Sequence, residues 1–142
     1  MLFSINMLLE LSIIVTSFLV SLIIITQIVS YPLFLKVNQN NFSEYHNSYT
    51  LSISKIVLPL MLAELSISLA LFLSKNDFNS IVALSINIAI WLSTFLIQVP
   101  IHNKINFQYS EVLIKKLIRS NWIRTFLWCA KLITLLNMKQ VV

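Results

Sequence analysis

Two histidines, one acid and one arginine are the residues of this chain best suited to chemistry. His46 follows a polar segment, and His102 ends the stretch 91–102. Imidazole titrates near neutral pH and binds transition metals, so the pair could supply a general base, the ligands of a metal ion or a bis-histidine haem. Glu64 and Arg124 lie within apolar segments, where charges are normally paired and functional. We interpret these four as candidate catalytic residues, with Glu64 carrying a proton and Arg124 stabilising an anion or oxyanion.

Polar side chains also recur at helical spacing along two of the apolar segments. The first stripe is Asn87, Trp91, Thr94, Gln98 and His102, and the second is Asn121, Arg124, Trp128 and Lys131. Residues three and four apart share one side of a helix, and lipid cannot satisfy their polar groups, so both stripes must face other helices or a wet cavity. Together with aromatic residues at matching depth, they predict these substrate-binding residues: Tyr31, Tyr49, Trp91, Gln98, Asn121 and Trp128.

Composition places the chain in the membrane class. Of 142 residues only 11% are charged, about half of what a soluble domain carries, and the mean hydropathy is +0.86. The net charge of +5 is scattered without a dense basic run, so nucleic acid is not expected as a partner. Cys129 is the single cysteine, which excludes an intrachain disulfide and leaves the redox compartment open.

The apolar segments predict an all-α fold, an integral-membrane antiparallel four-helix bundle built as one domain from residues 1–142. The expected spans are about 7–30, 51–73, 81–101 and 117–136, and about 42–50 form an amphipathic lead-in to the second span. Pro32 is expected to end the first helix, and Pro59 to kink the long second helix. The first span lacks a cleavage site and is expected to be retained.

The distribution of lysine and arginine predicts the orientation. Five basic residues lie in or near the two longer connections, namely Lys36, Lys104, Lys115, Lys116 and Arg119. Lys75 and Lys139 lie on the opposite side. The positive-inside rule then places both termini outside the cytoplasm, most simply in a bacterial inner membrane, although a thylakoid membrane stays open.

Folding the four spans antiparallel divides the polar residues into two groups by depth. His46 and Glu64 are 18 residues apart on one helix, which separates them by about 27 Å and prevents them from binding one metal ion. An upper group near the cytoplasmic face contains the two histidines. A lower group contains Glu10, Glu64 and Lys131, with Arg124 between the layers. The plainer alternatives are that the histidines meet headgroups and water, and that Glu64 pairs with Arg124 or Lys131 only to hold helices together.

Two groups of residues resemble an uncharacterised family of small bacterial four-span membrane proteins. The first comprises Tyr31-Pro32-Leu33-Phe34, then Phe42, Tyr45 and His46, then Pro59, Met61, Glu64 and Leu65. The second comprises residues 98–102, then Asn121-Trp122, Arg124-Thr125 and Trp128. The second group is also similar, more distantly, to the anthrone-oxygenase-like family at Gln98, Pro100, His102, Asn121, Trp122 and Arg124. That similarity implies oxygenation of a flat polycyclic phenolic substrate.

Two functional hypotheses from different classes follow. The favoured one is a membrane oxidoreductase or oxygenase that acts on a lipophilic, aromatic or quinone-like molecule, with His46 and His102 as base or as ligands of a transition metal or haem. The other is a non-catalytic accessory or pigment- or haem-carrying subunit of a larger membrane complex, in which the polar stripes are interhelical glue. Membrane lipid is an expected partner in both, and a homo-oligomer stays open.

Overall fold

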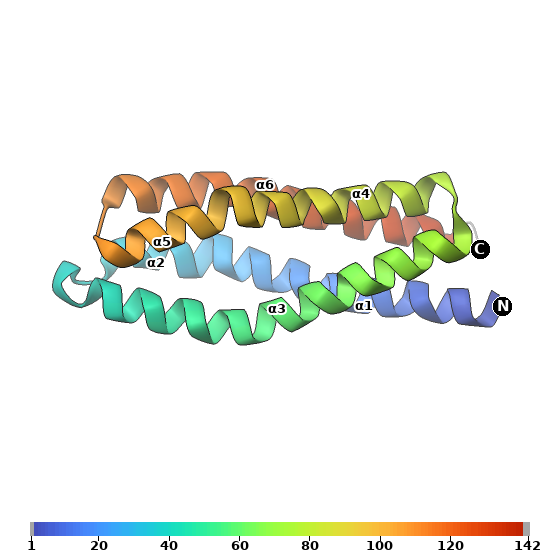
Figure 1. Ribbon diagram of the computed structural model, residues 1–142, viewed down its shortest axis with the longest axis horizontal. Helices are drawn as coiled ribbons and strands as arrows, with labels where there is room; N and C mark the ends of the chain where they lie inside the picture. The colour runs from blue at the N-terminus through green and yellow to red at the C-terminus, as the bar shows by residue number, and fades with distance from the viewer. Residues whose placement is uncertain (1, 141–142) are drawn as a thin grey trace.

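Four helical rods run antiparallel along the length of the molecule (Figure 1). The structure is a computed structural model that describes residues 2–140, with side chains described from residue 5. The first rod joins α1 (Leu2–Ile25), η1 (Thr26–Ser30), α2 (Tyr31–Leu33) and η2 (Phe34–Lys36), and the second joins η3 (Gln39–Asn41) to α3 (Phe42–Lys75). The third joins α4 (Phe78–Ser93), η4 (Thr94–Gln98) and α5 (Val99–Phe107), and the fourth is α6 (Glu111–Gln140). This part of the chain is all-helical, as the sequence predicts.

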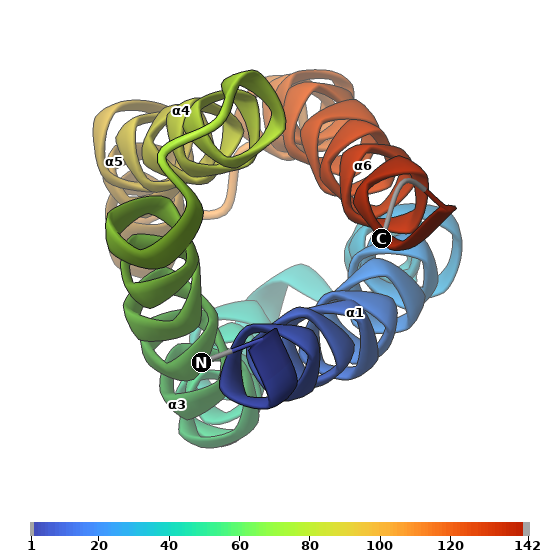
Figure 2. The same cartoon turned by 90° about the vertical axis from the view of Figure 1, so that its right-hand side faces the viewer.

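The rods occupy the four corners of a square when the bundle is viewed from its end (Figure 2). α1 packs against α3 and α6, and α4 packs against the same two helices. Both termini and the α3–α4 turn lie at one end, while the η2–η3 and α5–α6 connections lie at the other. The second end carries the two histidines, and we call it the histidine end.

A π-helical turn precedes each of the two prolines nearest the histidine end. η1 comes before Pro32 and η4 before Pro100, and neither proline ends its helix. The prediction that Pro32 closes the first helix is therefore wrong. A π turn shifts the backbone hydrogen bonds by one residue and so accommodates a residue that has no N–H to donate. The helix instead ends after Lys36, where Val37 becomes extended.

The predicted lead-in and second span form one continuous helix, α3, with Pro59 inside it. A short turn then reverses the chain. Asn76 closes α3 in the left-handed conformation (φ 47°), which asparagine tolerates better than most residues. Asp77 caps α4 in a capping box: its carboxylate accepts from the Ser80 N–H at 2.8 Å, and the Ser80 hydroxyl accepts from the Asp77 N–H at 3.1 Å.

Three of the described helical rods are long and apolar enough to span a membrane, judged by length and composition. They are the rods that contain α1, α3 and α4. α6 is not among them, and it carries Arg124 and Lys131 within its sequence. Both of these side chains are buried inside the bundle.

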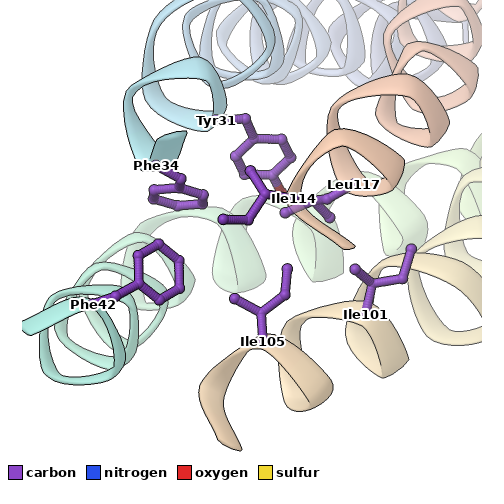
Figure 3. Packing of buried hydrophobic residues seen from close by; sticks show 7 residues of the cluster. All are labelled: Tyr31, Phe34, Phe42, Ile101, Ile105, Ile114 and Leu117. Atoms are coloured by element: carbon purple, nitrogen blue, oxygen red, sulfur yellow. The ribbon is translucent and has the colours of Figure 1, made fainter. Parts of the chain in front are cut away.

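The buried apolar residues form three clusters along the bundle axis. The cluster at the histidine end brings together aromatic residues from the first two rods and isoleucine and leucine from α5 and α6 (Figure 3). Its members are Tyr31, Phe34, Phe42, Ile101, Ile105, Ile114 and Leu117. We call it the aromatic cap.

The α4 cap gives a test of the turn that connects the second and third rods. Asp77→Ala is expected to lower the free energy of unfolding by about 1 kcal/mol, because the Ser80 N–H loses its acceptor. Partial burial acts to raise the pKa of Asp77, but the Ser80 hydrogen bonds and the Lys75 ammonium at 3.5 Å hold that pKa below its ordinary value of 3.8. The stabilisation is thus present above about pH 4 and is lost as the pH falls through the folded-state pKa.

Thermal unfolding in mild detergent, followed by circular dichroism, measures this effect. Asp77→Asn is the matched control, since asparagine caps helices about as well as aspartate but carries no charge. Equal stability of the wild type and Asp77→Ala at neutral pH would contradict the assigned cap.

Candidate functional site

Four side chains form a continuous hydrogen-bonded chain at the histidine end. His46 Nε2 lies 2.9 Å from His102 Nδ1, and His102 Nε2 lies 2.9 Å from the Tyr31 hydroxyl. The other ring nitrogen of His46, Nδ1, bonds to Asn106 Oδ1. An amide oxygen only accepts, so His46 Nδ1 carries its hydrogen, His102 Nδ1 donates to His46, and Tyr31 donates to His102. This relay uses all four imidazole nitrogens.

The aromatic cap separates the relay from the aqueous end of the bundle. Phe42 stacks on the His46 ring at a centroid distance of 5.5 Å, and Phe34 meets the same ring edge-on at 5.1 Å. Figure 3 shows these two rings beside Tyr31. Phe34, Phe42 and His46 are all fully buried. These two rings therefore cover His46, whereas His102 and Asn106 are half-buried.

A cavity of about 320 Å³ borders the relay. Its wall is mainly apolar, with Leu19, Ile23, Val57 and Met61 among the lining residues, and its polar end is formed by Tyr31, His102, Asn106 and Arg124. Ligand cavities of this size usually combine such a wall with a few polar groups that fix orientation. His46 is behind His102 and is not part of the wall.

The cavity opens sideways, between α3 and the rod formed by α4, η4 and α5. The exposed residues of its wall all belong to these two rods: Ser54 and Leu58 on α3, and Phe95, Val99 and Asn103 opposite. Wall residues on α1 and α6 are buried or half-buried. The opening is therefore on the flank of the bundle, not at its end.

Arg124 connects the cavity to a second buried network. Its guanidinium lies beside Tyr31 and donates to Asn121 Oδ1 at 3.2 Å. The Asn121 amide donates to Gln27 Oε1 at 2.9 Å, and the Gln27 amide donates to the Ile118 carbonyl oxygen at 3.0 Å. This network ties α6 to the π turn of the first rod.

Gln98 occupies the equivalent π turn of the third rod. Its side-chain oxygen accepts from the Ser93 hydroxyl at 3.2 Å, and its amide reaches the Ser120 hydroxyl at 3.5 Å. The two π turns thus direct Gln27 and Gln98 inward, toward α6. Such turns recur near functional sites, because they rotate side chains that regular α-helix would place elsewhere.

A separate polar cluster lies deeper in the bundle and joins all four rods. Lys131 Nζ is 2.7 Å from Glu64 Oε1, and neither side chain is exposed. Hydroxyls of Ser12 and Ser68 donate to the same carboxylate oxygen at 2.8 and 3.2 Å. Lys131 and the Asn87 amide donate in turn to the Ser68 hydroxyl. An apolar layer that contains Met61, Ile90 and Trp128 packs in the middle of the bundle.

The structure therefore groups most of the predicted site residues but not all of them. Tyr31, His46 and His102 form the relay, and the cavity wall includes Tyr49, Trp91, Gln98, Arg124 and Trp128. Asn121 contacts the cavity only through Arg124. Glu64 is outside this site and pairs with Lys131, one of the two partners the sequence allowed, while Glu10 pairs with Lys139 at the surface.

Asn106 and Gln27 are the site residues that the sequence interpretation missed. Asn106 is four residues after His102, so it extends the polar stripe of that helix by one further turn. Continuing the helical spacing past His102 would have found it. Gln27 gives no comparable signal, because its inward direction depends on the π turn.

The two histidines were also predicted as metal or haem ligands. Two ligands of one tetrahedral metal have their nitrogens about 3.3 Å apart, whereas these nitrogens are 2.9 Å apart and share a hydrogen. A porphyrin would have to lie between rings that are stacked at a centroid distance of 5.0 Å. Among the described residues no third His, Cys, Asp or Glu joins them. This arrangement fits a hydrogen-bonded pair, and ligation stays a prediction that requires the rings to part.

Comparison of the chain with protein-family models, with curated proteins and with solved structures gives no match. The resemblance to small bacterial membrane proteins and to the anthrone-oxygenase-like family thus remains a hypothesis that depends on the motif residues alone.

The deep ion pair gives a test of what holds the four rods together. Glu64→Gln is expected to destabilise the protein by about 3 kcal/mol, because Lys131 would be left buried without a counter-charge. Replacing both residues by methionine is expected to recover most of that loss. Thermal unfolding in mild detergent measures both effects.

Glu10→Gln is the matched control, since it breaks the exposed Glu10–Lys139 pair, in which both side chains are more than half exposed. Its expected cost is below about 1 kcal/mol. Similar losses for Glu10→Gln and Glu64→Gln would contradict the assigned role of the deep pair.

Proposed function

We propose that this protein is a small integral-membrane oxidoreductase or oxygenase that acts on a lipophilic, aromatic or quinone-like molecule. The observation that carries the proposal is the mainly apolar cavity, open at the flank of the bundle, whose polar end is formed by Tyr31 and His102. A molecule dissolved in the bilayer would enter through that opening and present its oxygen to the relay.

All four rods span the membrane in this proposal. α6 shows lipid an apolar outer face that includes Ile123, Phe126 and Ile133, while its buried Arg124 and Lys131 face the bundle interior. In this proposal the histidine end, with its basic connections, faces the cytoplasm and both termini lie outside, in a bacterial inner membrane.

Pro59 has a specific role in the proposed entry path. Leu58 and Ser54, immediately before it and one turn earlier, lie at the cavity mouth. A proline inside a helix removes one backbone hydrogen bond and bends the axis. The bend would hold the first half of α3 away from η4 and α5, and so keep the flank open.

The proposed chemistry is removal of a proton from a hydroxyl of the bound molecule. The hydroxyl gives its proton to the Tyr31 oxygen as Tyr31 gives its own to His102 Nε2. His102 Nδ1 passes its hydrogen to His46 Nε2, and the charge ends on His46, whose Nδ1–H bonds to Asn106. The resulting oxyanion lies beside Arg124. Ionising a phenol or hydroquinone in this way makes it easier to oxidise.

Dioxygen or a membrane quinone would accept the electrons in a complete reaction. A transition metal or haem would supply electron transfer or oxygen activation if it were bound. The relay does not need one, since every proton in the steps above moves between protein atoms.

The deep polar cluster favours a second candidate, a non-catalytic accessory or pigment-carrying subunit. It joins Ser12, Glu64, Asn87 and Lys131 from four different rods without opening to the cavity, which is what interhelical glue would do. A subunit that serves only in assembly would need this cluster but no cavity.

Blocking the cavity mouth tests the entry path. Decylubiquinone is expected to quench the fluorescence of Trp91 and Trp128, which line the cavity, in a Trp122→Phe background that removes the exposed indole. Ser54→Phe fills the mouth and is expected to weaken this quenching about tenfold.

Ser66→Phe is the matched control for the mouth variant. Ser54 and Ser66 are both exposed on α3, and each donates its hydroxyl to a carbonyl of its own helix. Equal affinity in the two variants would show that the quinone does not enter between α3 and the third rod.

Ionisation of a bound phenol tests the relay. A long-chain 4-nitrophenol, whose phenolate absorbs visible light, is expected to ionise at lower pH in the protein than in empty detergent micelles. His102→Asn is expected to raise its half-ionisation pH by about one unit, because Tyr31 loses the acceptor for its proton.

Asn103→Ala, at an exposed position of the same cavity wall, is the control for the relay variant. An unchanged half-ionisation pH in His102→Asn would contradict the relay. The absorption spectra and metal contents of the wild type, His46→Ala and His102→Ala complete this experiment. A haem band or stoichiometric metal that both alanine variants lose would favour ligation over the hydrogen-bonded pair.

A further inference from the structure

We infer that the molecule bound in the cavity is a monoanionic amphiphile, with one acidic oxygen group as its head and an apolar body. This inference rests on the proposed lateral cavity and adds the charge of its ligand. It depends on two observations at the cavity wall, namely a buried cation without a counter-ion, Arg124, and two further buried donors without acceptors, on Tyr49 and Trp91.

Arg124 is the buried cation. Its side chain is 8% exposed, and its neighbours are the hydroxyl of Tyr31 and the amide oxygen of Asn121, which are both neutral. No carboxylate pairs with it in the described part of the chain.

The five acidic residues of the chain are all accounted for elsewhere. Four form ion pairs with lysines, namely Glu10, Glu64, Asp77 and Glu111. The fifth, Glu44, is exposed in the first turn of α3. A charge removed from water without a partner is strongly destabilising, so the counter-ion of Arg124 must come from outside the chain.

Three hydrogen-bond donors around the same cavity support this conclusion. The Tyr49 hydroxyl, the Trp91 indole N–H and the Arg124 Nε–H are buried and make no hydrogen bond within the described residues. All three residues line the cavity. Buried donors are nearly always paired in native proteins, and three that border one space call for an acceptor inside that space. An anionic oxygen would be the strongest acceptor for all of them.

The deep cluster shows the opposite pattern and serves as an internal contrast. Its unpartnered buried atoms are the acceptors Glu64 Oε2 and Asn87 Oδ1, and its lysine already has a carboxylate. The Thr16 hydroxyl on α1 is also unpartnered. Unpartnered donors therefore gather at the cavity, where a ligand can reach them, and the apolar wall beyond provides room for the body of the molecule.

Binding of three probes with the same eighteen-carbon chain tests the inference. They are oleate, oleoyl lysophosphatidate and oleyl alcohol. Each is titrated into the full chain in mild non-ionic detergent, and native mass spectrometry measures the bound fraction without using tryptophan fluorescence. Oleate is expected to bind at least about tenfold more tightly than the alcohol. The relative affinity of oleate and lysophosphatidate identifies a carboxylate or a lipid phosphate as the preferred head.

Two variants assign the preference to the polar end of the cavity. Arg124→Gln is expected to remove the tenfold preference for oleate, while Arg119→Gln, which removes an exposed charge from the same helix, is expected to keep it. Tyr49→Phe removes only an unpartnered hydroxyl. This variant is expected to keep the unfolding temperature of the wild type and to bind oleate about fivefold more weakly. The test therefore stays valid even if Arg124→Gln does not fold.

The outcomes separate this inference from the proposed function. Oleate and oleyl alcohol could bind with equal affinity, and Arg124→Gln and Tyr49→Phe could leave both affinities unchanged. That result would contradict the anionic head group but not the lipophilic cavity. If no probe binds, and Ser54→Phe has no effect on quinone quenching, the proposed lipophilic cavity itself fails.

Discussion

The structure depends on one constraint: polar side chains buried inside an apolar bundle must form their hydrogen bonds and ion pairs with one another. Large apolar side chains make up much of the exposed surface along the rods, so buried polar groups find few partners there. In the deep cluster the charges of Glu64 and Lys131 neutralise each other, and serine hydroxyls from two helices donate hydrogen bonds to the same carboxylate oxygen. The same requirement explains why the polar residues of this chain come in groups and why those groups connect different rods.

The histidine end meets the constraint differently. The relay satisfies the imidazoles with neutral partners, and the aromatic cap keeps water away from them. Arg124, by contrast, keeps a full charge next to a cavity and has neutral neighbours. One bundle thus contains a cluster whose charges are paired within the chain and a cavity-lining arginine whose neighbours are neutral.

The two π turns connect these clusters to the backbone. Each π turn adds one residue to a turn and shifts the hydrogen-bond ladder ahead of the proline that follows. Gln27 and Gln98 lie in these turns and are buried. Tyr31 and His102, which follow the turns by one and four residues, take their positions from them. The proline motifs are therefore part of how the site is built.

The sequence by itself determined the helical fold class and the faces on which the polar stripes lie, but not the full membership of the polar groups. Asn106 and Gln27 were missed, and Glu10 pairs at the surface. Helical spacing is local, so the stripes through Gln98 and His102 and through Asn121 and Arg124 could be read directly, and antiparallel depth brought His46 to the level of His102. The tertiary structure decided which of these polar side chains pair with one another. Whether Glu64 would meet Lys131 or Arg124 depends on how helices rotate about their axes, which spacing does not specify. The sideways opening and the unpaired charge of Arg124 likewise arise only when four rods pack, because each is a property of the space between helices.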